Sequence, residues 1–168
     1  LSGLIAIIGL DRESDRAVIV LGNRDHAEMR HAILWQVMDD RGAAERPDWN
    51  QDIWNLYQDA AAEHEAKWEE TRQQRLKDTR PSLAPGEYAG GYSSATLGGI
   101  TIDRAGSDLL LRTGAVDMTM THWHLDTFLV EYLPWNLREF AEFRIGPNGR
   151  IASLQLFGAE FQPTGKSD

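Results

Sequence analysis

Two histidines and an aspartate in the C-terminal half of the chain have residue types and a spacing that could bind a metal ion. His122, His124 and Asp126 alternate along the sequence, and alternation along a β-strand places side chains on one face, within reach of each other. Two imidazoles and a carboxylate can hold zinc or non-haem iron with open coordination positions. The same groups can instead form a hydrogen-bonded polar network or contact a ligand. Together with Trp123 they form the candidate site, for which we predict a ligand-binding or structural polar cluster with no metal, no cofactor and no catalytic residue.

The composition excludes several other kinds of chemistry. None of the 168 residues is a cysteine, so there is no disulfide framework, thiolate metal site or cysteine nucleophile. The formal net charge is −9, and a chain this acidic does not favour nucleic acid, whose phosphates need clustered Lys and Arg. No apolar run approaches the roughly 20 residues of a membrane-spanning helix. The pairs Gly90-Gly91 and Gly98-Gly99 do not join a strand to a helix, which argues against a phosphate-binding loop.

Residues 86–168 have the pattern of a small antiparallel β domain. Short alternating apolar runs are separated by turn residues, of which Asn148-Gly149 is the clearest pair because both residues accept a positive φ in a tight hairpin. Roughly six to eight short strands in this space indicate a closed barrel or a sandwich. We expect the aromatic residues to fill its core rather than to line a ligand cavity; they are Trp123, Phe128, Tyr132, Trp135, Phe140 and Phe143.

Residues 1–46 predict a strand hairpin followed by a helix. The runs 4–10 and 17–21 are apolar, rich in β-branched residues and separated by a charged turn, which is typical of strands covered on both faces. Asp25 with Glu28 resembles a capping box at the start of the helix. Gly42 predicts the end of the helix.

Residues 47–80 predict one long polar helix, with Asp48 as its N-cap. Its narrow apolar stripe consists of Ile53, Tyr57, Ala60, His64 and Trp68. Such a helix is stable mainly when its stripe docks on another element. The prolines of segment 81–85 then predict a stiff linker. The predicted fold class is therefore α+β: a terminal hairpin and helix (1–46), a connecting long helix and linker (47–85), and a β-barrel domain (86–168).

The order of these segments resembles a known family. The stretch 81–92, with Pro81-Ser82-Leu83 and Glu87-Tyr88, and the later His122-Trp123-His124 and Asp126-Thr127-Phe128 are similar to the C-terminal barrel domain (DUF3471) of serine hydrolases of the class C β-lactamase and penicillin-binding-protein family. That domain is described as lipocalin-like. Residues 1–42 resemble the last strand pair and the C-terminal helix of the hydrolase domain.

The resemblance implies a parent that hydrolyses peptide, amide or ester bonds through an acyl-serine intermediate, but its catalytic motifs are absent. No serine has lysine three residues later, no tyrosine has asparagine two residues later, and Arg112-Thr113-Gly114 lies in the barrel segment rather than before the hairpin. We therefore expect a non-catalytic accessory module that is either the C-terminal portion of such a hydrolase or a truncated relative of it.

The unpaired edges of a two-stranded hairpin favour association. We expect the 4–21 hairpin to pair either with a second copy, giving an oligomer, or with a missing N-terminal hydrolase domain. The alternative is a lipocalin-like protein that encloses a small apolar ligand. Relatives are often periplasmic or secreted, and the sequence does not establish the location of this chain.

Overall fold

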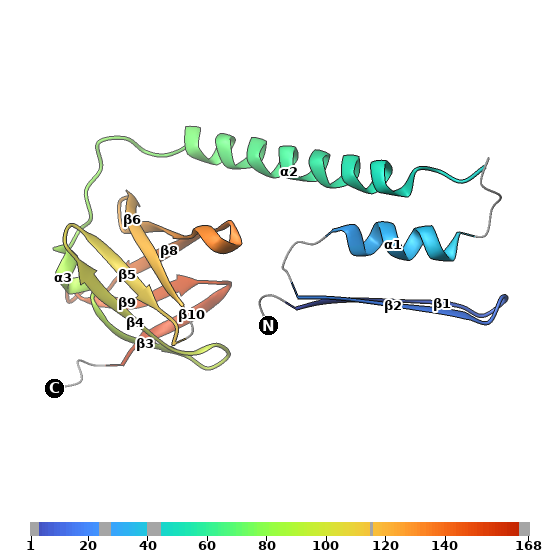
Figure 1. Ribbon diagram of the computed structural model, residues 1–168. Coiled ribbons are helices and arrows are strands. Elements are labelled where there is room, and N and C mark those ends of the chain that lie inside the picture. Colours follow the sequence, from blue (N-terminus) through green and yellow to red (C-terminus); the bar gives the residue numbers. More distant parts are fainter. Residues whose placement is uncertain (1–3, 24–27, 40–44, 115, 165–168) are drawn as a thin grey trace. The chain divides into compact units, whose positions relative to one another are not determined.

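The computed structural model describes residues 4–23, 28–39, 45–114 and 116–164, and it confirms the α+β fold class (Figure 1). The chain divides into two compact units, Leu1–Gln73 and Gln74–Asp168. The first contains a strand hairpin and two helices, and the second contains a closed β-barrel. Residues 74–85, part of the connecting segment in the sequence analysis, thus belong to the same compact unit as the barrel.

The predicted N-terminal hairpin is confirmed. Strand β1 (Ile5–Asp11) pairs antiparallel with β2 (Arg16–Gly22) along its whole length, with Ile8 opposite Ile19. Asp11 stabilises the turn, because its Oδ1 accepts a hydrogen bond from the backbone N–H of Glu13 at 3.0 Å. Six of the seven cross-strand pairs join apolar residues or glycine, and the pair beside the turn is the ion pair of Asp11 with Arg16.

One face of the hairpin is covered by a helix and the other face is exposed. Helix α1 (Met29–Met38) packs on one face and buries Ala32 and Leu34. Its approach is close, since a Cβ on Gly9 would lie 2.6 Å from Leu34 Cδ1. Every residue of the opposite face is exposed, so among the described residues only one face is covered, and the expectation of cover on both faces is wrong for this chain by itself. The predicted helix-end residues Asp25 and Gly42 lie outside the described residues.

Helix α2 (Trp49–Gln73) is largely exposed, and none of its residues is buried. Its predicted N-cap is confirmed, because Asp48 Oδ1 accepts a hydrogen bond from the N–H of Gln51 at 3.1 Å. The helix packs on α1 near its start, where Trp49 stacks on Trp35 at 5.4 Å between ring centroids and the Tyr57 hydroxyl lies 3.0 Å from His31 Nδ1.

The helix ends at Gln73 and not at Arg80. The predicted helix was therefore too long. Arg75 and Leu76 form hydrogen bonds with β6 of the barrel instead of continuing the helix. None of the helices in the described ranges combines the length and the apolar character that a membrane crossing needs.

The second unit begins with a short helix, α3 (Pro85–Tyr88), and continues as eight strands. The strands are β3 (Gly90–Ser94), β4 (Gly98–Ala105), β5 (Asp108–Arg112), β6 (Asp117–His124), β7 (Thr127–Tyr132), β8 (Leu137–Ile145), β9 (Ile151–Leu156) and β10 (Ala159–Pro163). Each pairs antiparallel with the next, and β10 pairs with β3 to close an up-and-down barrel. The 3-10 helix η1 (Leu133–Trp135) separates β7 from β8.

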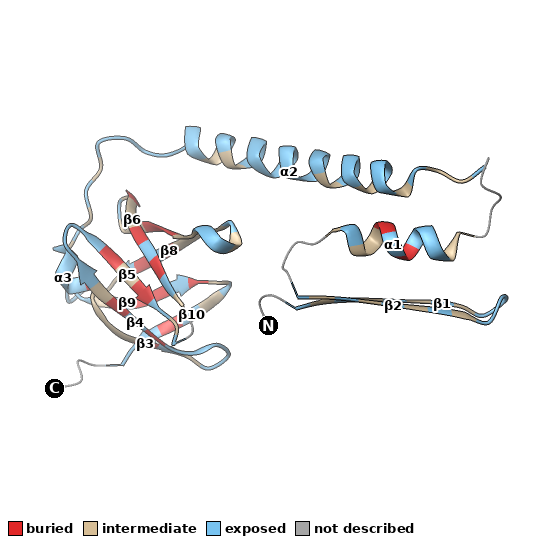
Figure 2. Cartoon of the chain, viewed as in Figure 1, coloured by how far each residue is buried: buried red, intermediate tan, exposed pale blue. Residues whose placement is uncertain are grey.

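The barrel interior is filled by one cluster of buried side chains drawn from α3 and all eight strands. Tyr88, Phe128 and Phe143 meet edge to face, at 4.9–5.6 Å between centroids. Of the other predicted core aromatics, Tyr132 packs against this cluster. The core prediction is wrong for the remaining three, because Trp123 is buried outside the cluster and Trp135 and Phe140 are half-buried outside it. Figure 2 shows how the buried residues concentrate in the barrel strands.

The Asn-Gly connection between β8 and β9 is a hairpin, as predicted, but a longer one. Gly146 N–H donates to the carbonyl of Arg150 at 2.7 Å, and Gly149 N–H donates to the carbonyl of Gly146 at 2.9 Å. Of the Asn148-Gly149 pair, only Gly149 has a positive φ, of 73°. The Asn148 side chain instead accepts a hydrogen bond from the N–H of Arg150 at 3.1 Å.

Candidate functional site

The candidate residues lie where β6 turns into β7, but they do not share one strand face. Strand β6 ends at His124, the pairing with β7 shifts in register between His122 and His124, and Asp126 lies in the turn. Leu125 occupies the turn with a φ of +47°. Simple alternation was therefore the wrong geometry for these residues, because an irregularity and a turn interrupt the strand.

The carboxylate of Asp126 accepts three hydrogen bonds. Its Oδ1 accepts a hydrogen bond from the N–H of Ser82 at 2.8 Å and another from the Tyr88 hydroxyl, and its Oδ2 accepts one from Ser82 Oγ at 2.7 Å. The Tyr88 hydroxyl in turn accepts a hydrogen bond from the N–H of Leu83 at 3.1 Å. The carboxylate thus anchors the chain on its way into α3.

The electrostatics of this group favour an ionised aspartate and a neutral tyrosine. Burial by itself would raise the pKa of Asp126, but the hydrogen bonds from Tyr88 and Ser82 outweigh it and hold that pKa below its usual value. Burial, together with the hydrogen bond to Asp126, raises the pKa of Tyr88 far above its usual value. Tyr88 is therefore a hydrogen-bond donor at neutral pH and has no basic character.

The preceding segment, residues 74–84, which we call the strap, binds to the same turn through Arg75. Its Nε donates to the carbonyl of Trp123 at 2.5 Å, and its Nη2 donates to the carbonyl of His122 at 3.1 Å. The guanidinium also lies over the Trp123 ring, 5.0 Å from its centroid. Trp123 therefore provides a surface on which the strap packs.

The two histidines also form local hydrogen bonds. His124 Nδ1 accepts a hydrogen bond from the N–H of Leu76 at 3.3 Å, which requires this nitrogen to carry no proton. His122 Nε2 lies 2.9 Å from the carbonyl of Leu125 and must be the donor there. The N–H of Leu125 donates to Thr79 Oγ1 at 3.1 Å. Strap and turn are thus joined at four strap positions, Arg75, Leu76, Thr79 and Ser82.

This geometry suits a structural role better than a metal centre. Within the described ranges, no group of three or more His, Asp or Glu side chains is arranged to hold a metal ion. Both carboxylate oxygens of Asp126 already accept hydrogen bonds, and His124 offers its Nδ1 to the backbone. The arrangement attaches the strap to one end of the barrel.

Sequence reasoning found the turn but missed its partners. Arg75, Thr79 and Ser82 lie more than 40 positions before the residues they contact, and nothing in their spacing links them to the turn. The usable signal was the resemblance, since it paired the stretch around Ser82 and Tyr88 with the His122 to Phe128 cluster. The structure shows that these two stretches are in contact.

Fold and site together define a class: a small eight-stranded antiparallel barrel whose N-terminal strap is hydrogen-bonded to the β6–β7 turn. Comparison with protein families is more specific. The sequence model of a domain of unknown function, DUF3471, matches residues 74–167, which is more than half of the chain. The chain therefore belongs to the DUF3471 family.

The match begins at Gln74, which is also the first residue of the barrel unit. The strap is accordingly part of the family domain. A search of curated proteins finds no match to this chain.

Proposed function

We propose that this chain is a non-catalytic accessory module of a β-lactamase-related serine hydrolase, and that its N-terminal hairpin docks on the hydrolase domain. The observation that carries the proposal is the exposed apolar face of the hairpin. The resemblance of residues 1–42 to the last strand pair and terminal helix of such a domain supports the choice of partner. The sequence given contains none of the Ser-x-x-Lys, Tyr-x-Asn and Lys/His-Thr/Ser-Gly motifs, which supports a non-catalytic role for this part of the protein.

The exposed face is continuous and carries no charge. Ile8 and Ile19 lie opposite each other and are 62% and 63% exposed, and Leu10 and Leu21 are 72% and 76% exposed. The whole face consists of Leu4, Ala6, Ile8, Leu10, Ala17, Ile19 and Leu21. Burying one Leu or Ile side chain contributes about 1.5–3 kcal/mol, so covering this face would contribute substantially to an association.

The edges of the hairpin are also open to pairing. In the described part of the chain, β1 and β2 pair only with each other. A two-stranded sheet is marginally stable by itself, and unpaired edges accept further strands. A partner that supplies a strand at an edge and an apolar layer on the exposed face satisfies both needs, and a sheet domain with helical layers provides both.

Sedimentation velocity combined with hydrogen exchange tests the docking surface. In the isolated chain we expect the exposed face to drive self-association, because the proposed partner is absent, and we expect Ile8→Glu with Ile19→Glu to abolish it. The matched control is Leu97→Glu with Leu133→Glu, which places the same charges on exposed leucines of the barrel unit. The proposal would be contradicted if the unsubstituted chain stayed monomeric at high concentration while its β1 and β2 amides exchanged freely.

The identity of the partner is tested at the level of the gene. A reading frame that continues upstream of the Leu1 codon and encodes a Ser-x-x-Lys motif would support a β-lactamase-like hydrolase as the partner. An upstream frame, or a neighbouring gene, that encodes an unrelated domain which protects the hairpin amides would support docking and contradict the parent class.

The lipocalin-like alternative, a small apolar ligand inside the barrel, stays a prediction. The interior is occupied by a continuous cluster of buried side chains, including the large residues Tyr88, Phe161 and Met120. No observation favours an enclosed ligand over this packing.

A further inference from the structure

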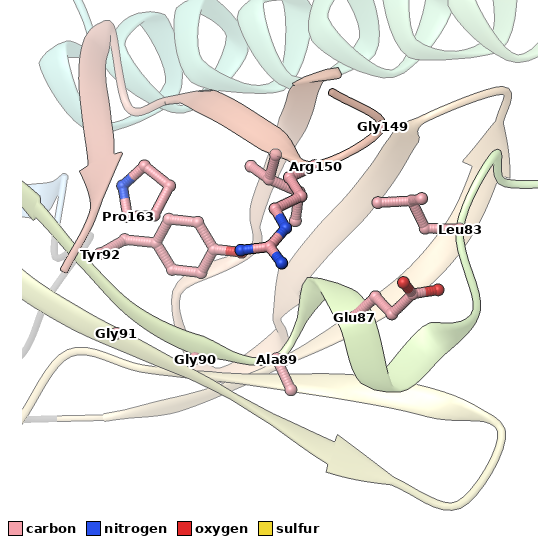
Figure 3. A pocket seen from close by; sticks show the side chains of 10 residues that line it. Leu83, Glu87, Ala89, Gly90, Gly91, Tyr92, Gly149, Arg150 and Pro163 are labelled. Atoms are coloured by element: carbon pink, nitrogen blue, oxygen red, sulfur yellow. The ribbon is translucent and has the colours of Figure 1, made fainter. Parts of the chain in front are cut away.

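A pocket of about 520 Å³ lies on the barrel unit; it includes the strap residue Leu83 but none of the β6–β7 turn residues (Figure 3). Its lining residues come from the approach to α3, from α3 itself, from the start of β3, from the β8–β9 connection and from the end of β10. This volume lies in the range of small-molecule sites, which are mostly apolar with a few polar groups. We propose that this pocket binds a small zwitterion with an apolar body, namely an apolar α-amino acid or a short peptide. The inference is independent of the proposed docking of the hairpin.

The walls of the pocket provide the apolar contacts. Leu83, Tyr92, Ile151 and Pro163 line it. Tyr92 presents no free polar group, because its hydroxyl donates to the carbonyl of Tyr88 at 2.8 Å. A ligand therefore meets carbon atoms over much of this surface, which favours a ligand with an aliphatic side chain.

The positive charge of the pocket is available to a ligand. Arg150 is exposed, and its guanidinium forms no hydrogen bond or ion pair with any residue in the described ranges. Its backbone is held separately, through the N–H bond to Asn148 Oδ1 at 3.1 Å. A guanidinium is planar, always charged and matched to a carboxylate, which makes the carboxylate end of a ligand its natural partner.

The negative charge lies on a different element. Glu87 belongs to α3, and Figure 3 shows that it and Arg150 reach the pocket from separate segments. Its Oε2 accepts a hydrogen bond from the N–H of Ala84 at 2.9 Å, and among the described residues Oε1 has no partner. A simple anion would meet Arg150 but be repelled by Glu87, whereas an ammonium group on the same ligand would complement Glu87.

Glycine also lines the pocket. Gly90 lines it with a φ of +149°, a region that side chains rarely adopt, and a Cβ there would meet nothing within 4 Å. A residue with a side chain at position 90 would therefore strain the backbone there. The lining thus combines apolar walls, one available cation and one available carboxylate oxygen.

Titration of the full 168-residue chain with alanyl-leucine, followed by amide NMR shifts, tests the inference. We expect saturable shifts at residues around the pocket. N-acetyl-alanyl-leucine, which lacks the ammonium, and alanyl-leucinamide, which lacks the carboxylate, should each bind about tenfold more weakly, as expected for the loss of a hydrogen bond to a charged group.

Two substitutions assign each end of the ligand. Arg150→Gln should remove the difference between the free acid and the amide, and Glu87→Gln should remove the difference between the amine and its acetyl form. Gln at position 87 can still accept from the N–H of Ala84, so the start of α3 is preserved. Arg144→Gln removes a positive charge elsewhere on the barrel and should leave binding unchanged.

Three results would overturn the proposal. The first is the absence of saturable shifts around the pocket up to the solubility limit of the dipeptide. The second is an affinity for alanyl-leucine that is the same in the Arg150→Gln variant, the Glu87→Gln variant and the unsubstituted chain. The third is equal affinity for the acetylated and free dipeptides, which would indicate a site for simple organic anions.

Discussion

The hairpin sheet and the barrel are both antiparallel, yet the barrel buries its apolar face and the hairpin leaves one apolar face exposed. Alternate residues of the barrel strands point into an interior where side chains such as Ile102, Val130 and Phe161 are completely buried. Alternate residues of β1 and β2 form an apolar face that stays in solvent. The hairpin strands are apolar on both faces and the barrel strands alternate, and the two sheets also differ in how they end.

Closure is the physical reason for this contrast. In the barrel each strand has a neighbour on both sides, so no backbone edge is left and the inner face encloses its own core. A two-stranded sheet has two edges and two faces, and α1 covers only one face. The barrel therefore buries its apolar face within its own strands, whereas one apolar face of the hairpin stays exposed among the described residues.

The largest expected effect is on the core of the barrel. Phe161→Ala should lower the free energy of unfolding of the barrel unit by about 3–5 kcal/mol, because it removes a fully buried ring and leaves a cavity. Urea denaturation followed by NMR intensities of barrel amides measures this loss. A loss below about 1 kcal/mol would mean that the interior is loosely packed, and the contrast with the hairpin would then fail.

A smaller loss is expected when the strap is released from the turn. Asp126→Ala removes the acceptor of three hydrogen bonds and should destabilise the barrel unit by about 2–3 kcal/mol. Hydrogen exchange should show faster exchange at the N–H of Ser82 before the barrel strands respond. Unchanged stability would show that the strap is a passive linker, whereas the structure places it within the barrel unit.

The same carboxylate gives a pH dependence whose sign is fixed. The folded state lowers the pKa of Asp126, so its contribution to stability is complete above the unfolded value of about 4 and is lost as pH falls through the lowered folded value. We expect the parent chain to lose stability on acidification more steeply than Asp126→Asn. Parallel pH profiles for the two proteins between neutral and acidic pH would contradict this assignment.

Arg75 should have a moderate effect. Arg75→Met keeps an unbranched side chain over Trp123 but loses the cation and two hydrogen bonds to carbonyls, so we expect a loss of about 1 kcal/mol in the barrel unit. Arg104→Met, at an exposed arginine that bonds only its own turn, is the matched control. Equal effects of the two substitutions would show that Arg75 does not anchor the strap.

The smallest effect on stability is expected on the exposed face of the hairpin. Ile19→Thr retains a β-branched side chain on a face that nothing in the described chain covers, so the unfolding of either unit of the monomer should change by no more than about 0.5 kcal/mol. Its effect should appear in sedimentation, as weaker association. A large loss of stability in the monomer would show that this face is already covered.

The sequence predicted the elements better than it predicted their contacts. The hairpin, the long helix and the barrel each follow from local patterns, and Asp48 and the Asn148-Gly149 connection were identified from residue type alone. The end of α2 was misplaced because Arg75 and Leu76 leave the helix for tertiary contacts, which no local rule encodes.

The candidate site shows the same limit. Alternation placed His122, His124 and Asp126 on one face, but the register shift and the left-handed Leu125 moved Asp126 into a turn. The partners of these residues come from a segment distant in sequence, and the pocket beside Arg150 and Glu87 depends on the closure of the barrel. Long-range geometry of this kind is not contained in the spacing of residues.

The attachment of residues 74–84 to the β6–β7 turn has a consequence for how this domain can be transplanted. A gene fusion that starts at residue 86 would cut away the Ser82 hydroxyl and amide groups that Asp126 binds, and it would leave the carboxylate with the Tyr88 hydroxyl as its remaining side-chain donor at an unfinished barrel end. A junction at Gln74 carries those groups along. Evolutionary shuffling of the domain should for the same reason conserve its boundary ahead of Arg75.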